Sequence, residues 1–318
     1  MEKQVRILLS VAELDSSFSK MVETLKEYAT VDICDLTNYS LKDYDIFIGK
    51  KLAKSKLSEA NKLKYIFAYK TGVDDFPLQE LEAMNITLVN SHADSSIIAE
   101  YAFGMSVALV NRINEFDRNL RQGIWYDNDN LYWKSIFNMN VGLLGYGHIG
   151  KDIHKLLIRN NINTYTIDRG HDYKDINLVK DLDELVSKCD LIISSVPKTP
   201  ETNKLFNQAI FLKMNGKFIV NVGRANVIDQ ADLYEALFNE TIGGAAIDTW
   251  EEKPKNKRTK LMPSSYSFHN LNNIILSPHA AMRVADGHDR YVMDVVDNII
   301  SLLTKNEVRN VVSYKKGY

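Results

Sequence analysis

The stretch VGLLGYGHIG at residues 141–150 decides the fold of this chain of 318 residues. Its apolar start predicts a buried strand, the G-x-G-x-x-G pattern a tight turn, and the amphipathic run 151–157 a helix. In such a turn Gly145 allows the sharp bend, Gly147 lets the backbone approach a phosphate, and Gly150 lets the helix pack closely on the strand. The order strand, turn, helix predicts a dinucleotide pyrophosphate on the helix N-terminus. An ordinary structural turn is the alternative interpretation.

An acidic residue stands where the adenosine ribose of a dinucleotide is expected. Asp168 follows a second strand-like run, 164–167, and stands 18 residues beyond Gly150. A carboxylate there hydrogen-bonds the ribose hydroxyls and repels the extra phosphate of NADP. Arg169 beside it is able to accept that phosphate. The sequence therefore favours NAD as the cofactor and leaves NADP as the less favoured alternative.

Composition excludes several other classes of function. The net charge is −2, with acidic and basic residues dispersed, so there is no basic stripe of the kind that binds nucleic acid. The first apolar run, 7–9, is too short for a signal peptide, and the longest weakly polar run, 102–110, is far shorter than a membrane span. No Cys/His spacing predicts a metal site. We expect a cytoplasmic protein without metal, membrane or nucleic-acid partners.

Two series of apolar runs each predict a doubly wound α/β domain with a parallel sheet. The first series has strands near 5–9, 31–34, 45–48, 65–68 and 87–89 and helices near 18–28, 58–62 and 78–83. The second has strands from 141 and near 164–167, 191–194, 217–220, 244–247 and 274–276, with helices near 182–188, 208–214 and 230–238. Only the second series contains the glycine turn.

Two longer helices are expected to bridge the domains. Residues 97–120 are apolar nearly all round as far as Val110, which predicts burial between the domains or against a second subunit. Residues 292–303 repeat apolar side chains at helical spacing. The predicted architecture is a Rossmann NAD-binding domain, residues 96–286, inserted into a flavodoxin-like substrate domain, residues 1–95 and 287–318.

Three polar segments follow predicted strands of the second domain, where an open α/β sheet presents its ligand groups. Arg224 follows the apolar run 218–220, and its two-pronged guanidinium suits a carboxylate beside a carbonyl. His279 follows 274–276, and its imidazole is able to protonate an alkoxide that forms on hydride addition. The third segment, 246–254, by itself indicates a strand and a charged loop. From spacing alone, structural roles for Arg224 and His279 remain open.

Further segments match the motifs of one enzyme family. They are 71–74 (TGVD), 90–101 (NSHADSSIIAEY), 196–202 (VPKTPET), 221–229 (NVGRANVID), 243–248 (GGAAID) and 277–279 (SPH). With the glycine turn, these motifs resemble the D-isomer-specific 2-hydroxyacid dehydrogenases over most of the chain. The resemblance implies a homodimeric oxidoreductase that transfers a hydride between NAD(H) and a small 2-keto or 2-hydroxy acid.

The resemblance also implies a role for each candidate residue. Arg224 would bind the substrate carboxylate and carbonyl, and His279 would be the general acid in reduction and the base in oxidation. Backbone groups of Gly72 and Val73 would meet the carboxylate from the other domain. The implied cofactor-binding residues are Gly145, Gly147, His148, Ile149, Gly150, Asp168, Val196, Pro197, Thr202, Val222, Gly223 and Asp248.

The chain departs from the family at one catalytic position. The family usually has a glutamate before the proline of the third segment, paired with the histidine, but here that residue is Lys253. An ammonium group near His279 would lower the histidine pKa and weaken the acid. Glu251 or Glu252 is the possible replacement, and we take Glu252 as the candidate. Two hypotheses follow: an active dehydrogenase with a rebuilt acid–base pair, or a catalytically impaired NAD-binding regulatory or scaffold protein.

Overall fold

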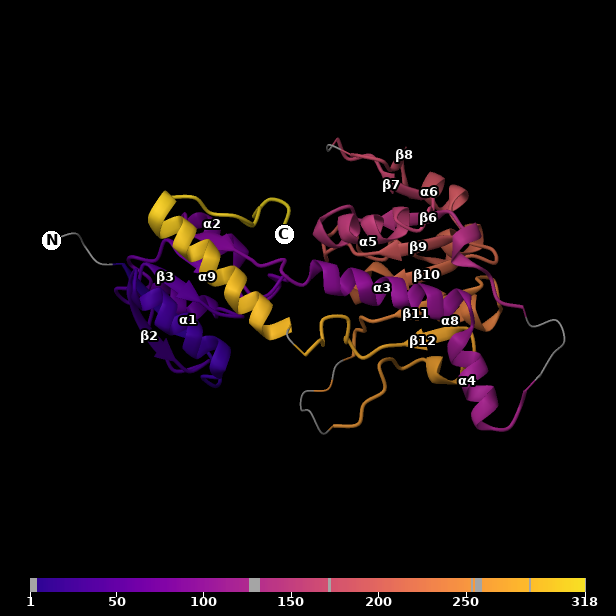
Figure 1. Ribbon diagram of the computed structural model, residues 1–318, viewed down its shortest axis with the longest axis horizontal. Helices are drawn as coiled ribbons and strands as arrows, with labels where there is room; N and C mark the ends of the chain where they lie inside the picture. The colour runs from indigo at the N-terminus through magenta and orange to yellow at the C-terminus, as the bar shows by residue number, and fades with distance from the viewer. Residues whose placement is uncertain are drawn as a thin grey trace. The chain divides into compact units, whose positions relative to one another are not determined.

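The chain divides into two compact units, each built around one parallel β-sheet (Figure 1). The computed structural model describes residues 5–125, 132–170, 173–252, 254, 259–285 and 287–317. Unit 1 comprises Met1–Asp94 and Val284–Tyr318, and unit 2 comprises Ser95–Arg283. Unit 1 is therefore assembled from both ends of the chain, and unit 2 from its middle.

Unit 1 contains a five-stranded parallel sheet. Its strands are β1 (Arg6–Ser10), β2 (Thr30–Cys34), β3 (Ile46–Ile48), β4 (Tyr65–Phe67) and β5 (Thr87–Val89). Its helices are α1 (Ser16–Lys26), the 3-10 helix η1 (Lys54–Glu59), α2 (Leu78–Ala83) and α9 (Gly287–Lys305). The strand order β2-β1-β3-β4-β5 is that of the flavodoxin-like doubly wound fold.

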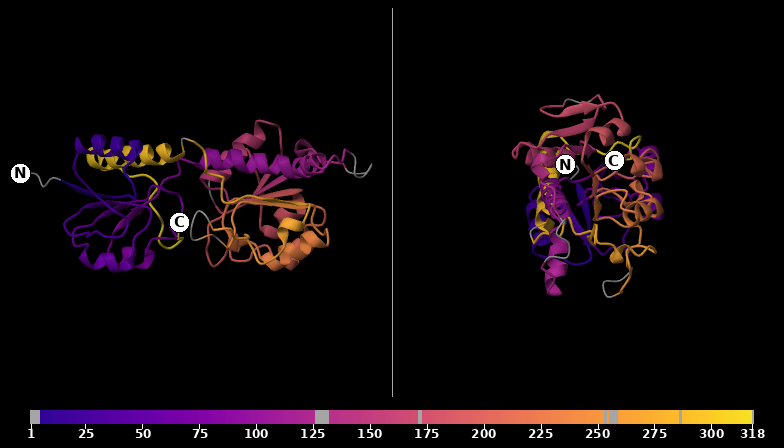
Figure 2. Two further views of the ribbon diagram at one scale, coloured as in Figure 1. Left: turned by 90° about the horizontal axis from the view of Figure 1, so that it is seen from below. Right: turned by 90° about the vertical axis from the view of Figure 1, so that its right-hand side faces the viewer.

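Both faces of this sheet are covered, as parallel strands require. Ile7 and Leu9 of β1 face one way and pack with α1 and α9, whereas Leu8 faces the other way and packs with α2 and η1. Figure 2 shows α1 and α9 together on one side of the sheet and α2 on the opposite side. The continuous apolar runs of the sequence reflect this burial on both faces.

Unit 2 contains a seven-stranded parallel sheet. Its strands are β6 (Val141–Leu144), β7 (Thr164–Ile167), β8 (Asn177–Val179), β9 (Leu191–Ser194), β10 (Phe218–Asn221), β11 (Gly244–Ile247) and β12 (Ile274–Leu276). Its α-helices are α3 (Ser95–Val110), α4 (Ile113–Arg121), α5 (His148–Ile158), α6 (Leu182–Lys188), α7 (Gln208–Lys213) and α8 (Gln230–Phe238). Its 3-10 helices are η2 (Ile136–Asn138), η3 (Ala225–Val227) and η4 (Phe268–Asn270).

The strand order of unit 2 is β12-β11-β10-β9-β6-β7-β8, which is the Rossmann order with one extra strand. One face packs against α3 and α5 and the other against α6, α7 and α8. The chain leaves β6 in one direction along the sheet and returns to β9 on its other side, so the order reverses between β6 and β9. The predicted fold class, two doubly wound parallel-sheet domains, is confirmed.

Four details differ from the sequence-based expectation. The helix expected over 97–120 is two helices, because Arg112 adopts a left-handed conformation (φ 56°) between α3 and α4. The α3 part packs on the sheet of unit 2, and α9 packs within unit 1. The helix expected near 58–62 is the 3-10 helix η1 at Lys54–Glu59, and β8 was not predicted.

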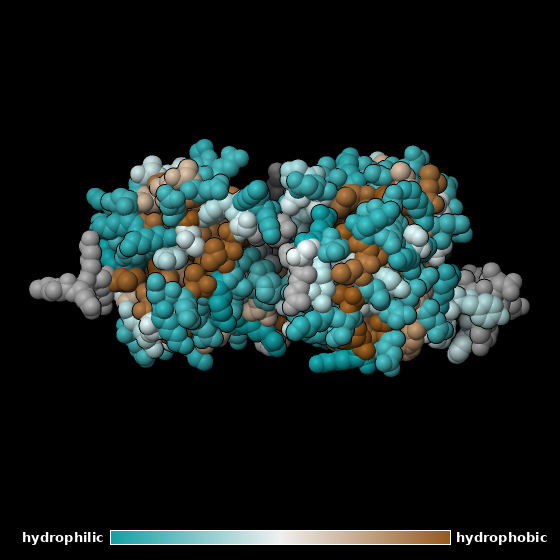
Figure 3. Space-filling view, turned by 90° about the horizontal axis from the view of Figure 1, so that it is seen from above, coloured by the Kyte–Doolittle hydropathy of each residue, from teal (hydrophilic) through white to brown (hydrophobic). Residues whose placement is uncertain are grey.

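The described residues contain no helix that is both long and apolar enough to span a membrane. On the face shown in Figure 3, hydrophilic residues surround separate apolar patches on both units. The described residues also contain no group of three or more His, Cys, Asp or Glu side chains arranged to hold a metal ion.

Candidate active site

The candidate residues of unit 2 follow the carboxyl ends of neighbouring strands. In sheet order these are His279 after β12, Asp248 after β11, Arg224 after β10, Val196 after β9, the glycine turn after β6 and Asp168 after β7. Because parallel strands end at the same edge, all of these residues lie along one edge of the sheet. The reversal of strand order at β6 and β9 is the point where such sheets bind their ligands.

The glycine turn leaves space for an anion at the N-terminus of α5. Gly145 has φ +100°, and a Cβ at Gly150 would lie 2.1 Å from the carbonyl oxygen of Gly145, so neither position has room for a side chain. A Cβ at Gly147 would meet no atom within 4 Å. No side chain caps α5, and no described residue accepts a hydrogen bond from the backbone N–H of Ile149 or Gly150. These features fit a dinucleotide pyrophosphate.

Asp168 is exposed at the end of β7, and β6 lies between β7 and the reversal point. Its backbone N–H donates to the Val179 carbonyl (2.8 Å), and its Oδ1 accepts from Gly170 N–H (2.9 Å). Tyr173 accepts a hydrogen bond from Arg169 N–H (2.8 Å) and so fixes the next residue of the loop. The carboxylate thus has a defined orientation and one oxygen, Oδ2, without a hydrogen-bond partner among the described residues.

The hydroxyl group of Thr202 holds the loop after β9 in place. Thr202 Oγ1 donates to the Pro197 carbonyl (2.8 Å) and accepts from Thr199 N–H (2.8 Å). The loop after β10 approaches it so closely that a Cβ at Gly223 would lie 2.6 Å from the Val196 carbonyl oxygen. Gly223 is therefore required by packing between two loops of the protein itself.

A fully buried amide shapes the loop that carries Arg224. Asn221 Oδ1 accepts from Gly223 N–H (3.1 Å), and its Nδ2 donates to the Arg224 carbonyl (3.0 Å) and to Thr249 Oγ1 (3.4 Å). Val222 is buried in the core, with its N–H bonded to the preceding strand end. Arg224 is half-buried, and its Nη1 donates to the Gly223 carbonyl (3.2 Å). These hydrogen bonds hold the turn that places Arg224 shortly after β10.

Asp248 is a buried carboxylate, 1% exposed, that organises the loop after β12. It accepts hydrogen bonds from the Ser277 hydroxyl and from Ala280 N–H (2.7 Å). Its backbone carbonyl accepts from His279 N–H (2.8 Å). Trp250 adds a hydrogen bond from Nε1 to the Ser277 carbonyl (3.0 Å). The resemblance assigns Asp248 to the cofactor. Its described contacts hold the segment that carries the candidate acid.

His279 is exposed and has φ +56°, an uncommon conformation for a residue other than glycine. Such strain costs about 1–3 kcal/mol, and the hydrogen bonds of Asp248 are what offset it here. Glu251 and Glu252 follow the buried Trp250 and are both exposed. Lys253 lies outside the described residues. The structure therefore leaves the choice between Glu251 and Glu252 as a prediction.

Gly72 and Val73 belong to unit 1, in the loop between β4 and α2. No described residue accepts a hydrogen bond from the backbone N–H of either one. Adjacent backbone N–H groups are able to bind an anion when they point to the same side. Their role as substrate-binding groups stays a prediction.

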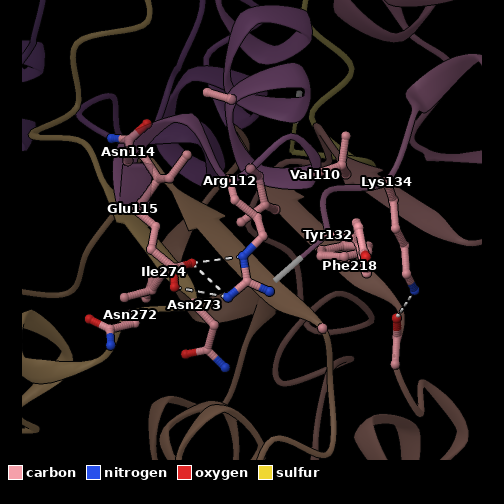
Figure 4. A pocket seen from close by; sticks show the side chains of 15 residues that line it. Val110, Arg112, Asn114, Glu115, Tyr132, Lys134, Phe218, Asn272, Asn273 and Ile274 are labelled. Atoms are coloured by element: carbon pink, nitrogen blue, oxygen red, sulfur yellow. Dashed lines mark hydrogen bonds and ion pairs between the residues drawn. The ribbon is translucent and has the colours of Figure 1, made fainter. Parts of the chain in front are cut away.

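The cavity in Figure 4 lies elsewhere, at the amino ends of β10, β11 and β12. It measures about 200 Å³ and is lined by apolar residues of the end of α3 and of the sheet, among them Leu109 and Phe218. The Arg112 guanidinium is paired with Glu115 (2.8 and 2.9 Å), and Lys134 Nζ donates to the Gly216 carbonyl (3.2 Å). The cavity is at the opposite edge from the candidate site and does not belong to it.

The chain belongs to the D-isomer specific 2-hydroxyacid dehydrogenase family. Residues 103–281 match the family model for the NAD binding domain. The chain is 27% identical over 322 residues to the D-3-phosphoglycerate dehydrogenase of Methanocaldococcus jannaschii, covering 98% of this chain but 57% of that protein. The chain thus spans little more than half the length of this relative. The family resemblance inferred from the sequence motifs is confirmed.

Other relatives match along more of their length. The hydroxypyruvate reductase of Thermotoga maritima is 27% identical over 271 residues, which cover 83% of this chain and 86% of that protein. The crystal structure of the PH0520 protein of Pyrococcus horikoshii superimposes with a TM-score of 0.83 at 25% identity and covers 98% of this chain and 96% of that one. These matches support a dehydrogenase and give no support to the alternative of an impaired regulatory or scaffold protein.

Sequence reasoning did not single out three residues that shape the site. Asn221 and Ser277 are adjacent in sequence to candidate residues, but their importance lies in hydrogen bonds to segments far along the chain. Tyr101 of α3 also bonds the Ser277 hydroxyl (2.9 Å). All three residues lie in the family-like segments 90–101, 221–229 and 277–279, and Asn221 and Ser277 also follow an apolar run directly.

Proposed function

We propose that this protein is an NAD(H)-dependent oxidoreductase that reduces a small 2-keto acid to the D-2-hydroxy acid and catalyses the reverse reaction. The observation that carries the proposal is the order along one sheet edge: Asp168, the glycine turn, Arg224 and His279. That order matches an extended dinucleotide with its adenosine end at β7 and the substrate at β10 to β12. Bound NADH supplies the hydride that reduces the keto carbon.

Arg224 orients the substrate in this proposal. Its guanidinium binds the substrate carboxylate through two parallel hydrogen bonds and polarises the neighbouring keto oxygen. The half-buried position strengthens these interactions, because less water screens the charge. The backbone N–H groups of Gly72 and Val73 in unit 1 remain proposed substrate-binding groups.

His279 moves the proton. In reduction it donates a proton to the keto oxygen as negative charge develops there, and in oxidation it accepts the hydroxyl proton. The buried Asp248 holds the loop, so the imidazole needs little reorganisation. Glu252 is the proposed carboxylate partner of the imidazole, with Glu251 as its competitor. A Glu252→Gln variant that loses more activity than Glu251→Gln supports this assignment, and the reverse result transfers the role to Glu251.

NAD is the proposed cofactor. The exposed Asp168 carboxylate has one oxygen without a hydrogen-bond partner among the described residues, which suits a ribose hydroxyl, and its negative charge disfavours a 2′-phosphate. The first-turn N–H groups of α5 and the open space at Gly147 receive the pyrophosphate.

A second copy of the chain is the proposed protein partner. Helix α4 has no buried residue, and Ile113 (51% exposed), Phe116 (37%) and Leu120 (51%) form one apolar face at helical spacing. Exposed apolar patches of this kind mark association surfaces. We assign this face of unit 2 to a homodimer contact.

The direct test is NADH oxidation by the purified protein over glyoxylate, hydroxypyruvate, pyruvate and bulkier 2-keto acids, with NADH binding measured on the same sample. Arg224→Ala should abolish most turnover, while Arg159→Ala, an exposed arginine after α5, should not. His279→Ala should lower the rate by roughly 10²- to 10⁴-fold. The exposed His269 gives the matched control, His269→Ala. Normal turnover by Arg224→Ala or His279→Ala would refute the assigned roles.

A further inference from the structure

The hydroxyl group of Thr71, beside the Gly72–Val73 loop, is the centre of a buried hydrogen-bond network in unit 1. Thr71 Oγ1 lies 2.9 Å from the Ser91 carbonyl, 3.0 Å from Asp94 Oδ1 and 3.1 Å from the Tyr291 hydroxyl. The backbone of the same loop is held as well, because Asn90 Nδ2 donates to the Thr71 carbonyl (2.7 Å). Four separate contacts therefore converge on one residue.

Asp94 and Tyr291 are the buried members of this network. Asp94 is 2% exposed and Tyr291 3%, and the tyrosine hydroxyl donates directly to Asp94 Oδ2. No cation among the described residues forms an ion pair with Asp94. Burial raises the pKa of the Asp94 carboxyl group and of the Tyr291 hydroxyl. Burying a carboxylate costs free energy unless the group is paired and hydrogen-bonded.

The network joins three segments that are distant in sequence. Thr71 belongs to the loop after β4, Asp94 is the last residue of unit 1 before α3, and Tyr291 lies in the first part of α9. The chain leaves unit 1 after Asp94 and returns to it at Val284. The two connections of unit 1 are therefore fixed to the loop of Gly72 and Val73, whose N–H groups have no acceptor among the residues that the structure describes.

We propose that Tyr291 and Asp94 are positioning residues that, through Thr71, hold the Gly72 and Val73 N–H groups in the orientation that binds the substrate carboxylate. This inference rests on the proposed function, because it assumes a carboxylate ligand at these two groups. Thr71 uses its hydroxyl for the network, and the N–H groups of Gly72 and Val73 have no acceptor among the described residues. Without the network the loop samples other conformations. Binding of the carboxylate then includes the free-energy cost of ordering the loop.

Tyr291→Phe is the decisive variant, because it keeps the ring and removes one hydroxyl. We expect the KM for the keto acid to rise roughly tenfold, the size of a lost hydrogen bond to a charged group. The Kd for oxamate, a carboxylate analogue of the substrate, should rise with it, while the Kd for NADH should not change. At Thr71, the serine variant should retain a KM near that of the wild type, and Thr71→Val should reproduce Tyr291→Phe.

Tyr314→Phe is the matched control. Tyr314 is a half-buried tyrosine of unit 1 whose hydroxyl accepts from Leu88 N–H (3.0 Å) and donates to the Ile86 carbonyl. Its removal should lower the melting temperature without changing KM or the oxamate Kd. A Tyr291→Phe protein with wild-type KM and oxamate binding, or a Tyr314→Phe protein with the same loss, would overturn the positioning role. A wild type that turns over no keto acid refutes the proposed function and the inference together, whereas normal turnover with unchanged KM in Tyr291→Phe refutes the inference alone.

Discussion

Alanine substitutions at the three glycines of the turn should have three different effects. At Gly150 the new Cβ would lie 2.1 Å from the Gly145 carbonyl oxygen, so the backbone must shift until the contact reaches at least 3.0 Å. Overpacking of this kind costs about 1–3 kcal/mol. At Gly145 the φ of +100° is unfavourable for alanine, with a cost of about 1–3 kcal/mol. Both variants should lose stability and NADH binding together.

Gly147→Ala should separate these two properties. The new Cβ meets no atom of the protein within 4 Å, and the φ of −80° suits alanine. Alanine is a poorer N-cap than glycine by roughly 0.5 kcal/mol or more, but it lowers the entropy of the unfolded chain by about 0.4–1 kcal/mol, so the two terms nearly cancel. The methyl group instead projects into the space assigned to the pyrophosphate. A clash of about 1.4 kcal/mol there raises the Kd for NADH tenfold.

The assay is a pair of measurements on each variant. Urea unfolding followed by circular dichroism gives the free energy of unfolding, and NADH fluorescence gives the Kd. Gly147→Ala should unfold within about 0.5 kcal/mol of the wild type and bind NADH at least tenfold more weakly. The reasoning is refuted if Gly147→Ala binds NADH normally, or if it loses as much stability as Gly150→Ala.

Three further predictions concern other parts of unit 2. Asp168→Ala should improve the use of NADPH relative to NADH by tenfold or more, measured as the ratio of kcat/KM values, because the repelling charge is lost. Asp229→Ala should lower the free energy of unfolding by about 1 kcal/mol, because this side chain caps α8. Lys204 holds the pKa of Asp229 below its ordinary 3.8. The stabilisation by Asp229 is therefore present above pH 3.8 and is lost as the pH falls. Urea unfolding should show a smaller difference between wild type and variant at pH 3 than at pH 7. Leu120→Asp should convert a dimer into monomers by light scattering, and a wild type that is already monomeric would contradict the assigned contact.

Apolar runs predicted most of the strands because a parallel sheet covered on both faces needs continuous apolar strands. Thr87–Val89 and Gly244–Ile247 occur at the predicted residues. The strand Asn177–Val179 was not predictable in this way, because it is at the sheet edge and two of its three residues are exposed. The break at Arg112 had no glycine or proline signal, although the apolar run ends at Val110, the last residue of α3.

The candidate site was predictable where residues follow strands directly. Arg224 and His279 come within a few residues of β10 and β12, so the topology of the sheet brings them to one edge. The Thr71 network was not predictable, because Tyr291 is 220 positions from Thr71 and no spacing rule connects them. The path of α9 across unit 1 creates that contact.

A buried aspartate has the same function in each unit. Asp248 holds the loop of His279 through the Ser277 hydroxyl and Ala280 N–H, and Asp94 holds the loop of Gly72 through the hydroxyls of Thr71 and Tyr291. The sheet brings each loop to its edge but does not fix the conformation of a loop beyond the last strand residue. Asparagine at either position keeps the volume but replaces one acceptor oxygen with a donor, which leaves a hydroxyl or N–H without a partner. Both carboxylates are therefore better explained by the loops they orient than by the stability they provide, since burying a charge is costly in itself.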